Sequence, residues 1–175
     1  MNYEIIDNAL SEEDLLQIQD VMMYNSKFPW YLNDEITTEK ERSPGFYATH
    51  MFFYNGADDD HKMFSDPAKL NVSPWISITQ PILKILNPKS ILRVKGNFYP
   101  RTNFMEEHQP HIDYPFCHSA ALFYVNTCNG FTRLEDDSII ESVANRLILF
   151  DGSLYHNSTT CTDQTGRFNI NFNFF

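Results

Sequence analysis

The chain has 175 residues, the length of one domain with a substantial hydrophobic core. Aromatic residues make up 15% of it, which is typical of packed sheets, and the formal net charge of -10 disfavours nucleic acid as a partner. The three cysteines lie far apart without a CxxC pair, which argues against a disulfide framework and a cysteine-based zinc site. No apolar run approaches the roughly 18 residues of a membrane span, and the N-terminal residues lack the basic segment of a signal peptide, so we expect a soluble, cytoplasmic protein.

The first 90 residues predict helices mixed with strands and loops. The expected elements are a strand at 3–6, a helix at 11–25, a loop at 27–45, a strand at 46–54 and a helix at 73–86. Ser11 is expected to cap the first helix, with Asp14 as its partner in a capping box. In the second helix Pro74 takes the first position, and Pro81 is expected to kink or split the helix because it removes an interior hydrogen bond. The acidic run at 58–60 most simply forms a solvated turn.

From residue 91 onward the pattern changes to short strands separated by turns. The expected strands lie at 91–99, 119–126, 131–134, 139–143, 147–150 and 167–174, with a further strand that begins at His111 and carries Asp113. Many short strands at regular spacing favour a sandwich or a barrel. Because side chains alternate along a strand, Arg93, Lys95, Asn97 and Tyr99 share the polar face of the first of these strands. No internal repeat or linker divides the chain, so we expect a single domain.

A His-x-Asp motif at His111 and Asp113 is the central functional signal. In an extended strand, residues i and i+2 point to the same side, so both side chains can reach one metal ion. His156 follows an apolar strand and a turn, and it can supply a third ligand. Two histidines and one carboxylate leave positions on the metal open, which is how non-haem Fe(II) oxygenases hold iron. Arg167, shortly after His156, makes the combination far more specific than the motif alone.

The other histidines are weaker candidates for ligands. His108 precedes His111 by an odd number of residues and would lie on the opposite face of a strand, so we expect it beside the ligands or in a loop. His118 is expected at the surface or on the substrate side. His50 and His61 lie before the strand-rich half and are not expected to bind the metal.

Five motifs occur together in the strand-rich half: Asn97-Phe98-Tyr99, His111-Ile112-Asp113, Leu147–Asp151, His156 and Gly166-Arg167-Phe168-Asn169. With them, residues 91–175 resemble the catalytic core of the 2-oxoglutarate- and Fe(II)-dependent dioxygenases, most closely the prolyl-hydroxylase-like branch with its small bacteriophage-type members. The resemblance implies a mainly β fold with flanking N-terminal helices, the double-stranded β-helix or jelly roll. It also implies one domain over 1–175, in which 1–90 supply helical support and the substrate rim and 91–175 form the catalytic core.

The resemblance further implies a role for each site residue. The implied set is His111, Asp113 and His156 as ligands of Fe(II), and Arg167, Tyr99, Asn97 and Asn169 as residues that bind 2-oxoglutarate. Arg167 suits the far carboxylate of 2-oxoglutarate because a guanidinium can pair with a carboxylate through two parallel hydrogen bonds. Lys95 is a lesser candidate for the same pocket.

The implied reaction is hydroxylation of a peptidyl prolyl residue or another aliphatic C–H bond, with O2 consumed and succinate and CO2 released. Asp113 favours hydroxylation, since halogenating relatives lack a carboxylate at that place. Ascorbate is a candidate additional reductant. A peptide and a free small molecule are both compatible with the sequence as substrates. Trp30, Tyr31, Tyr114 and Phe116 are candidates for lining an entrance, with simple packing as the alternative.

Three other functions stay open. A metal-dependent jelly-roll enzyme without 2-oxoglutarate would leave Arg167 as an ordinary strand residue, and a binding module would leave the histidines structural. Demethylation of nucleic acid is a third reading, because the pair of Asn97 and Tyr99 also resembles the alkylation-repair dioxygenases. Those enzymes carry a second arginine where this chain has Asn173, and the acidic charge also argues against that function.

Overall fold

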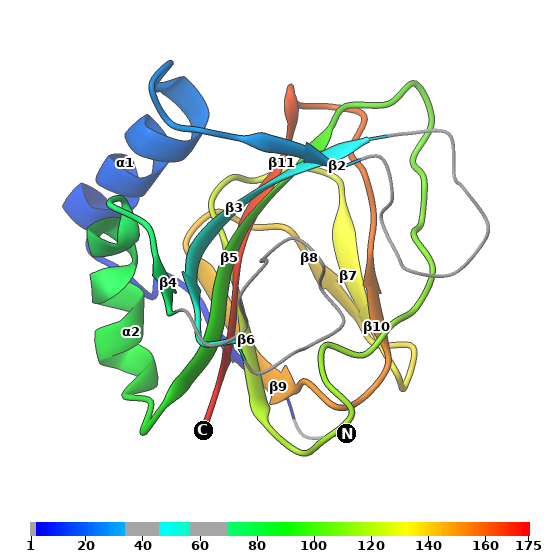
Figure 1. Cartoon of the computed structure of the whole chain (residues 1–175). Helices are drawn as coiled ribbons and strands as arrows, with labels where there is room; N and C mark the ends of the chain where they lie inside the picture. The colour runs from blue at the N-terminus through cyan, green and yellow to red at the C-terminus, as the bar shows by residue number, and fades with distance from the viewer. Residues whose placement is uncertain (1–2, 34–45, 57–69) are drawn as a thin grey trace.

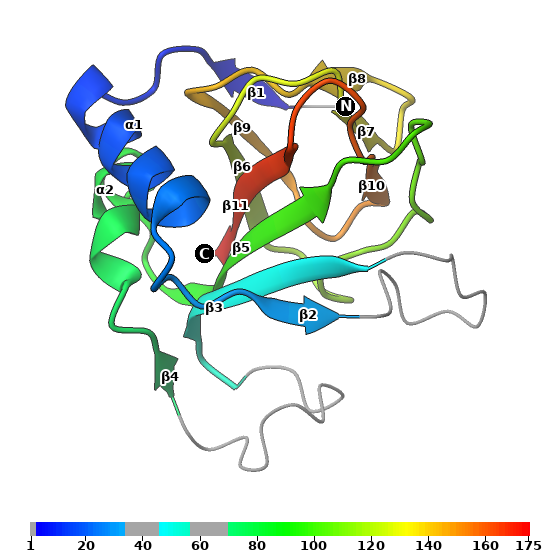
Figure 2. The same cartoon turned by 90° about the horizontal axis from the view of Figure 1, so that it is seen from above.

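Two antiparallel sheets face each other in this fold. A computed structural model describes residues 3–33, 46–56 and 70–175. The strands in these ranges are β1 (Glu4–Ile6), β2 (Tyr31–Asn33), β3 (Tyr47–Tyr54), β4 (Asn71–Val72), β5 (Ile91–Pro100), β6 (Ser119–Tyr124), β7 (Phe131–Leu134), β8 (Ile139–Glu141), β9 (Arg146–Asp151), β10 (His156–Ser158) and β11 (Gly166–Phe174). The large sheet has the order β1-β9-β6-β11-β5-β3-β2, with β4 paired to β3, and the small sheet has the order β10-β7-β8. Helices cover the outer side of the large sheet, and the small sheet lies on its inner side (Figure 1 and Figure 2).

The first helix begins where the sequence predicts. α1 (Glu12–Gln19) is capped by Ser11, whose hydroxyl accepts a hydrogen bond of 3.2 Å from the amide of Asp14. The other half of the capping box differs, because the Asp14 carboxylate accepts from the Ser11 hydroxyl at 2.7 Å rather than from its backbone N–H. The helix then continues as a π-helical stretch (Asp20–Tyr24) to within one residue of the predicted end.

Pro81 divides the second predicted helix, as expected. Ile76–Thr79 form a 3-10 turn, and α2 (Gln80–Leu86) begins immediately before Pro81, where the missing N–H costs no helical hydrogen bond. The α-helix therefore starts later than predicted, and Pro74 precedes it instead of opening it. Asn87 ends it in the left-handed conformation, with φ of 43°. In the described part of the chain, no helix is long and apolar enough to cross a membrane.

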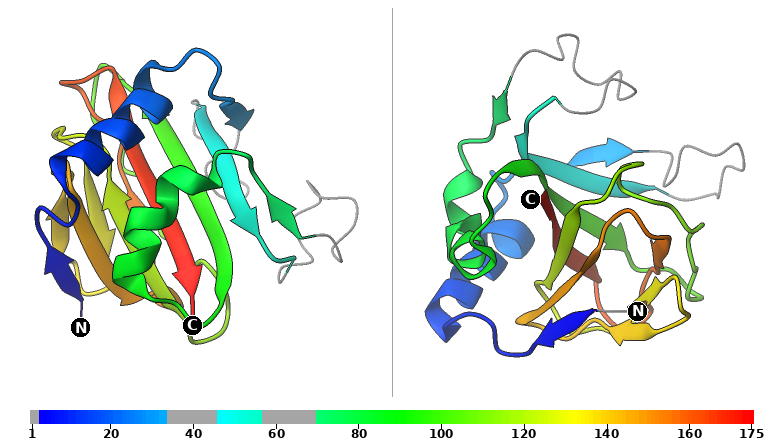
Figure 3. Two further views of the ribbon diagram at one scale, coloured as in Figure 1. Left: turned by 90° about the vertical axis from the view of Figure 1, so that its left-hand side faces the viewer. Right: turned by 90° about the horizontal axis from the view of Figure 1, so that it is seen from below.

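The central strands β6 and β9 contribute to two hydrophobic cores. Side chains on one face of these strands, including Phe123 and Leu147, pack with α1 and α2 in the larger core. Side chains on the other face, including Leu122 and Ile148, pack with β7 and β8 between the two sheets. The alternation of a strand places successive residues on opposite faces, so one strand can serve both cores. Figure 3 shows the two helices lying across the outer face of the large sheet.

The six strands predicted after residue 91 are present, each with ends within two residues of the expected bounds. Three short strands were not predicted: β2, β4 and β10. β2 corrects the expected loop at 27–45, and its three residues are too few to show an alternating pattern. The remainder of that loop from residue 34, and the acidic run at 58–60, lie outside the described residues.

Candidate metal and co-substrate site

Polar side chains line the inner face of the antiparallel pair β5 and β11. The pairing places Arg93 opposite Asn173, Lys95 opposite Asn171, Asn97 opposite Asn169, and Tyr99 opposite Arg167. The alternate side chains, such as Val94 and Ile170, pack toward the helices. A narrow cavity of about 40 Å³ is lined by residues of both strands and by His111, Asp113 and His156. The polar face predicted for the strand at 91–99 therefore forms one wall of this cavity.

The three predicted metal ligands meet in this cavity. One ligand atom from each of His111, Asp113 and His156 lies within 4.8 Å of the other two. The segment that carries the first two is irregular, not the predicted strand, because prolines flank it on both sides and proline cannot donate to a strand ladder. Backbone hydrogen bonds of 2.9 and 3.0 Å join His111 to His156, and the Asp113 amide donates to the carbonyl of Gly152 at 3.1 Å. These few contacts replace the ladder and bring the ligands together.

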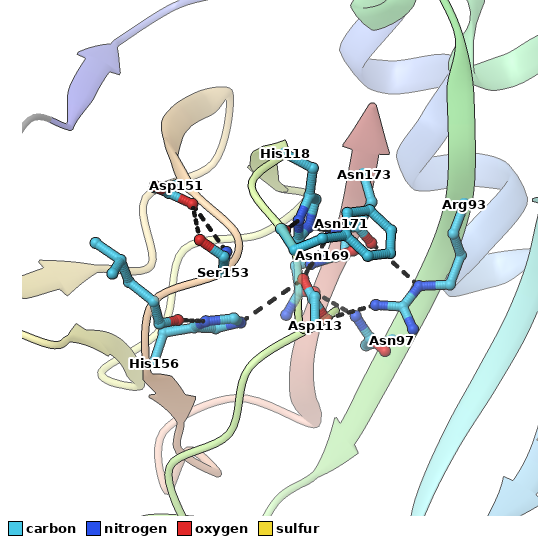
Figure 4. A network of polar contacts seen from close by, with 12 residues as sticks. Arg93, Asn97, Asp113, His118, Asp151, Ser153, His156, Asn169, Asn171 and Asn173 are labelled. Carbon is cyan, nitrogen blue, oxygen red and sulfur yellow. Dashed lines mark hydrogen bonds and ion pairs between the residues drawn. The ribbon is translucent and has the colours of Figure 1, made fainter. Parts of the chain in front are cut away.

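The imidazole nitrogens suit a metal. Nδ1 of His156 lies 3.0 Å from the carbonyl oxygen of Leu154, which can only accept, so Nδ1 carries the proton and Nε2 presents a lone pair. That Nε2 lies 3.8 Å from Oδ2 of Asp113 (Figure 4). Burial and the neighbouring His156 lower the pKa of His111 to about 4, so its ring is neutral at pH 7, the form that binds metals. Nδ1 of His111 is buried and has no hydrogen-bond partner among the described residues.

The carboxylate of Asp113 is held by three side chains. Nη2 of Arg93 donates to Oδ1 at 2.5 Å, and the amides of Asn173 and Asn171 donate to Oδ2 at 2.8 and 3.2 Å (Figure 4). Arg93 also donates through Nε to the amide oxygen of Asn173 at 3.1 Å, so these two residues support each other. Burial raises the pKa of Asp113, but the nearby positive charges, that of Arg93 above all, hold it well below its usual value. The carboxylate is therefore ionised and fixed in orientation.

The guanidinium of Arg167 is fully buried next to the cavity. It donates through Nε to the hydroxyl of Ser142 at 2.6 Å, through Nη2 to that of Thr132 at 2.7 Å, and through Nη1 to the carbonyl of Thr159 at 3.4 Å. Thr132 lines the cavity, and so does Tyr99, whose ring centre lies 5.8 Å from the guanidinium carbon. Within the described ranges, no carboxylate lies at ion-pair distance from Arg167. Among the described residues, the neighbours of this buried cation are therefore neutral oxygens and aromatic rings.

The remaining predicted co-substrate residues share the same wall. The amide of Asn97 donates to Oδ1 of Asn169 at 2.9 Å, and both side chains are buried. The hydroxyl of Tyr99 bonds to the side chain of Ser158, and burial raises the pKa of Tyr99, so its phenol keeps its proton at neutral pH. Oδ1 of Asn97 has no partner among the residues that the structure describes.

Lys95 lines the same cavity and is partly buried. In the described part of the chain its ammonium makes no hydrogen bond and no ion pair. Burial, together with the positive charge of Arg93, lowers the pKa of Lys95 to about 7, although the carboxylate of Asp113 acts in the opposite direction. Besides Arg167, Lys95 is therefore a second cation near the cavity without a carboxylate partner among the described residues.

His118 is buried, so the surface position, one of the two expected for it, is wrong. Its Nε2 accepts a hydrogen bond of 3.1 Å from the amide of Asn173, and its Nδ1 donates to the carbonyl of Phe116 at 2.9 Å (Figure 4). Asn173 therefore connects His118 to the carboxylate of Asp113. His118 therefore does not reach the metal site itself, and Asn173 lies between it and Asp113.

The other histidines stay outside the ligand group, as far as the structure describes them. His108 lies beside the site, with Nδ1 2.9 Å from the hydroxyl of Ser158. His50 is buried elsewhere, between the carbonyl of Pro29 and the hydroxyl of Ser73, each at 2.8 Å. His61 lies outside the described residues.

Two of the four aromatic residues suggested for an entrance are packing residues. Trp30 packs against the larger core and donates through Nε1 to the carbonyl of Met22 at 3.1 Å. Tyr114 is only 2% exposed and stacks on Phe116. Tyr31 and Phe116 are exposed and stay candidates for contact with a substrate.

Four residues that shape the site had no predicted role. Arg93 was recognised only as a member of the polar face, and Asn173 only as the place of a missing arginine. Their contact with Asp113 follows from the pairing of β5 with β11, so the register of that pair would have revealed it. Thr132 and Ser142 come from the small sheet and the turn after it, and no motif in the sequence marks them.

No protein-family model and no curated protein matches the sequence of this chain. Solved structures do match its fold. A prolyl hydroxylase from Trichoplax adhaerens, in complex with a peptide fragment of hypoxia inducible factor, has a TM-score of 0.64 and 14% identity, covering 99% of this chain and 83% of that one. A 2-oxoglutarate-Fe(II) oxygenase family protein from Burkholderia pseudomallei has a TM-score of 0.66 and 9% identity, covering 98% and 84%.

A third similar structure is the viral collagen prolyl hydroxylase from Paramecium Bursaria Chlorella virus-1, in complex with 2-oxoglutarate. Its TM-score is 0.58 with 13% identity, covering 99% of this chain and 95% of that one. At these identities the likeness concerns the fold, and it extends over nearly the whole chain. The chain therefore has the fold of the 2-oxoglutarate- and Fe(II)-dependent oxygenases, the jelly roll of the prolyl-hydroxylase-like branch that the sequence predicts.

Proposed function

We propose that this protein is an Fe(II)- and 2-oxoglutarate-dependent dioxygenase that hydroxylates an aliphatic C–H bond, in a peptidyl prolyl residue or in another substrate, and releases succinate and CO2. The observation that carries the proposal is the buried guanidinium of Arg167 beside a cavity that also holds the His-Asp-His group. An oxygenase of this class needs both parts, a metal site and a fixed cation for the far carboxylate of the co-substrate.

The surroundings of Arg167 favour an anionic ligand. Removing a guanidinium from water costs several kcal/mol, and neutral acceptors such as the hydroxyls of Ser142 and Thr132 compensate only in part. A carboxylate that enters from the cavity would supply the missing charge, and the phenol of Tyr99 could turn its one proton from Ser158 to that carboxylate. In a metal enzyme without such a co-substrate, Arg167 would serve only its hydrogen bonds to neutral groups of the protein.

The residues present suit a ferrous ion. His111, Asp113 and His156 offer two imidazole nitrogens and one carboxylate oxygen, which is the facial set of non-haem iron oxygenases. Bound iron would supply the activation of oxygen. Arg93 and Asn173 keep the Asp113 carboxylate ionised and oriented, and the Leu154 carbonyl keeps a lone pair of His156 directed at the site.

The cavity is smaller than 2-oxoglutarate, since about 40 Å³ gives room for only a few water molecules. Entry of the co-substrate therefore requires the lining side chains to move apart. Lys95 and Ser158 are partly buried members of that lining, whereas Asn97, Asn169 and His156 are buried. The first two are the residues that we expect to shift.

Anaerobic titration of metal-free protein, first with Fe(II) and then with 2-oxoglutarate, tests the proposal. The readout is the weak visible charge-transfer band of a metal-bound 2-oxoglutarate. The wild type is expected to develop the band, His111→Ala is expected to develop none, and Arg167→Gln should need roughly 10- to 100-fold more 2-oxoglutarate. Arg133→Gln is the matched control, because Arg133 lies on β7 next to Thr132 but pairs with Glu107 outside the cavity.

The outcomes separate the alternatives. Metal binding without a band in the wild type would leave a metal-dependent jelly-roll enzyme that uses no 2-oxoglutarate. Failure to bind metal at all would leave a binding module. An unchanged requirement for 2-oxoglutarate in the Arg167 variant would remove that residue from the co-substrate site.

A further inference from the structure

The inner wall formed by β5 carries more positive charge than the proposed co-substrate uses. Arg93 is paired with Asp113, and Arg167 is assigned to the far carboxylate of 2-oxoglutarate. Lys95 is the third cation of this region, and its ammonium has no hydrogen bond or ion pair within the described ranges. Lys95 is not one of the proposed metal ligands, and the proposed binding of 2-oxoglutarate does not require it.

Lys95 lies close to the proposed metal ligands and away from Arg167. The register of β5 and β11 places Lys95 opposite Asn171, whose amide donates to Oδ2 of Asp113, and it places Arg167 opposite Tyr99, four residues further along β5. At about 3.3 Å per residue, the backbones of Lys95 and Tyr99 are roughly 13 Å apart. Lys95 and Arg167, the two cations of this region without an ion-pair partner among the described residues, therefore lie toward different ends of the cavity. A single short dicarboxylate bound to both the metal and Arg167 does not need Lys95.

Unpaired acceptors accompany the unpaired ammonium. Oδ1 of Asn171 and Oδ1 of Asn97 are buried, line the same cavity and have no donor among the described residues. Both belong to positions adjacent to Lys95 in the sheet, one across the strand pair and one two residues along β5. This wall therefore presents one cation and two acceptors to whatever enters, which is complementary to a carboxylate with N–H or O–H groups nearby.

The charge balance supports an additional anion. A ferrous ion and the two carboxylates of 2-oxoglutarate cancel each other, and Asp113 cancels Arg93. Arg167 and Lys95 then leave an excess of positive charge in a region largely closed to water, which is unfavourable without another anion. Burial, and then the charge of Arg93, lower the pKa of Lys95, and a bound carboxylate would raise it again.

We infer that Lys95 binds a carboxylate of the primary substrate, so that the molecule oxidised is a small organic acid of the amino-acid type, not an internal segment of a peptide. This inference rests on the proposed function and narrows its substrate class. The ammonium of Lys95 would hold the substrate's carboxylate beside the metal ligands, and the amide oxygens of Asn97 and Asn171 would accept its N–H or O–H donors. Lys95 is then the residue that selects an acid over its neutral analogues.

The test uses the twenty free amino acids and their C-terminal amides as probes. Each is titrated into protein loaded anaerobically with Fe(II) and 2-oxoglutarate, and binding is followed by calorimetry and by the change in the charge-transfer band. At least one free acid is expected to bind the wild type, with its amide weaker by roughly 10- to 100-fold. Lys95→Met should lose this preference and Lys95→Arg should retain most of it, while Lys84→Met, an exposed lysine on α2, should leave it unchanged.

Other results would overturn the inference. They are equal binding of acids and amides, binding of the acid to Lys95→Met with wild-type affinity, and the absence of binding by any probe. A tenfold higher requirement of Lys95→Met for 2-oxoglutarate itself would assign the lysine to the co-substrate instead. A wild-type protein that shows no charge-transfer band before any probe is added would contradict the proposed function itself. That result is distinguishable from a failure of the inference about Lys95.

Discussion

Nη2 of Arg93 donates a hydrogen bond of 2.5 Å to Oδ1 of Asp113, and both side chains are almost completely buried. This contact occupies one oxygen of the carboxylate and leaves Oδ2 as the oxygen near His156. Arg93 comes from β5 in the large sheet, whereas Asp113 lies in an irregular segment that has no ladder to fix it. The orientation of the Asp113 carboxylate therefore depends on Arg93, which comes from β5 and not from the segments that hold the backbone of Asp113.

Replacing Arg93 with leucine is expected to weaken metal binding. The carboxylate loses the donor that orients it and the charge that holds its pKa low, and removal of such a supporting contact typically costs 10- to 100-fold in metal affinity. Anaerobic Fe(II) titration measures the effect. Arg101→Leu, at an exposed position just after β5, should bind as the wild type does. Equal affinities in the two variants would show that Arg93 does not orient the ligand.

Replacing Gly152 with alanine is expected to disturb the hydrogen bond between His118 and Asn173. A Cβ at this position would lie 2.8 Å from Cε1 of His118 and 2.9 Å from Cβ of Ala120, closer than side chains tolerate. The imidazole must move away from Asn173, and we expect the free energy of unfolding to fall by roughly 1–3 kcal/mol. Urea unfolding measures it, and the same substitution in a His118→Ala background should cost less. An equal cost in both backgrounds would mean that His118 is not the residue displaced.

Replacing Thr132 with valine keeps the shape of the side chain but removes the hydroxyl that accepts from both Arg167 and Tyr124, at 2.7 and 2.8 Å. Two buried donors then lack this acceptor, so we expect the free energy of unfolding to fall by about 1–3 kcal/mol. Thermal and urea unfolding measure the loss, with Thr165→Val at an exposed position as the control. Adding Tyr124→Phe should recover part of the loss. A wild-type stability for Thr132→Val would contradict the importance of this hydroxyl.

Stability is expected to fall as the pH is lowered below the ordinary pKa of histidine. Burial lowers the pKa of His50, with the Pro29 carbonyl acting weakly in the opposite direction. The unfolded chain takes up a proton that the folded chain excludes, so this contribution is complete above about pH 6.5 and is lost toward lower pH by at most roughly 1.4 kcal/mol per unit. Urea unfolding at about pH 7.5 and about pH 5 tests it, since His50→Gln should make the decline shallower. An identical decline in that variant would place its origin at other groups.

The sequence was sufficient to predict most features that depend on the alternation of side chains along a strand. Period two alone predicted the polar face of the strand at 91–99, and the structure aligns that face with Arg167 and the asparagines of β11. The ligand set was predicted from spacing and type, and His111, Asp113 and His156 do come together. Roles for Arg167, Tyr99, Asn97 and Asn169 stay predictions, which the titrations described above address.

What could not be predicted depends on contacts between distant segments. The path of the chain around Asp113 is set by three backbone hydrogen bonds and by Arg93. No pattern among neighbouring residues in the sequence reveals these contacts. The burial of His118 follows from Asn173, which is 55 residues away. β10 exists only because it pairs with β7, and a three-residue strand has too few positions for a pattern.

The pairing of β1 with β9 has a consequence for the synthesis of the protein. Glu4 lies opposite Leu149, and the backbone of Leu10 exchanges two hydrogen bonds with the side chain of Asn145, at 2.8 and 2.9 Å. A ribosome adding 5–20 residues per second needs roughly 7 to 30 seconds between these partners. During that interval β1 lacks the strand with which it pairs, whereas α1 can already pack against α2 and the β3–β5 pair, its partners in the larger core. We therefore expect β1, although it is translated first, to be among the last strands to reach its native place.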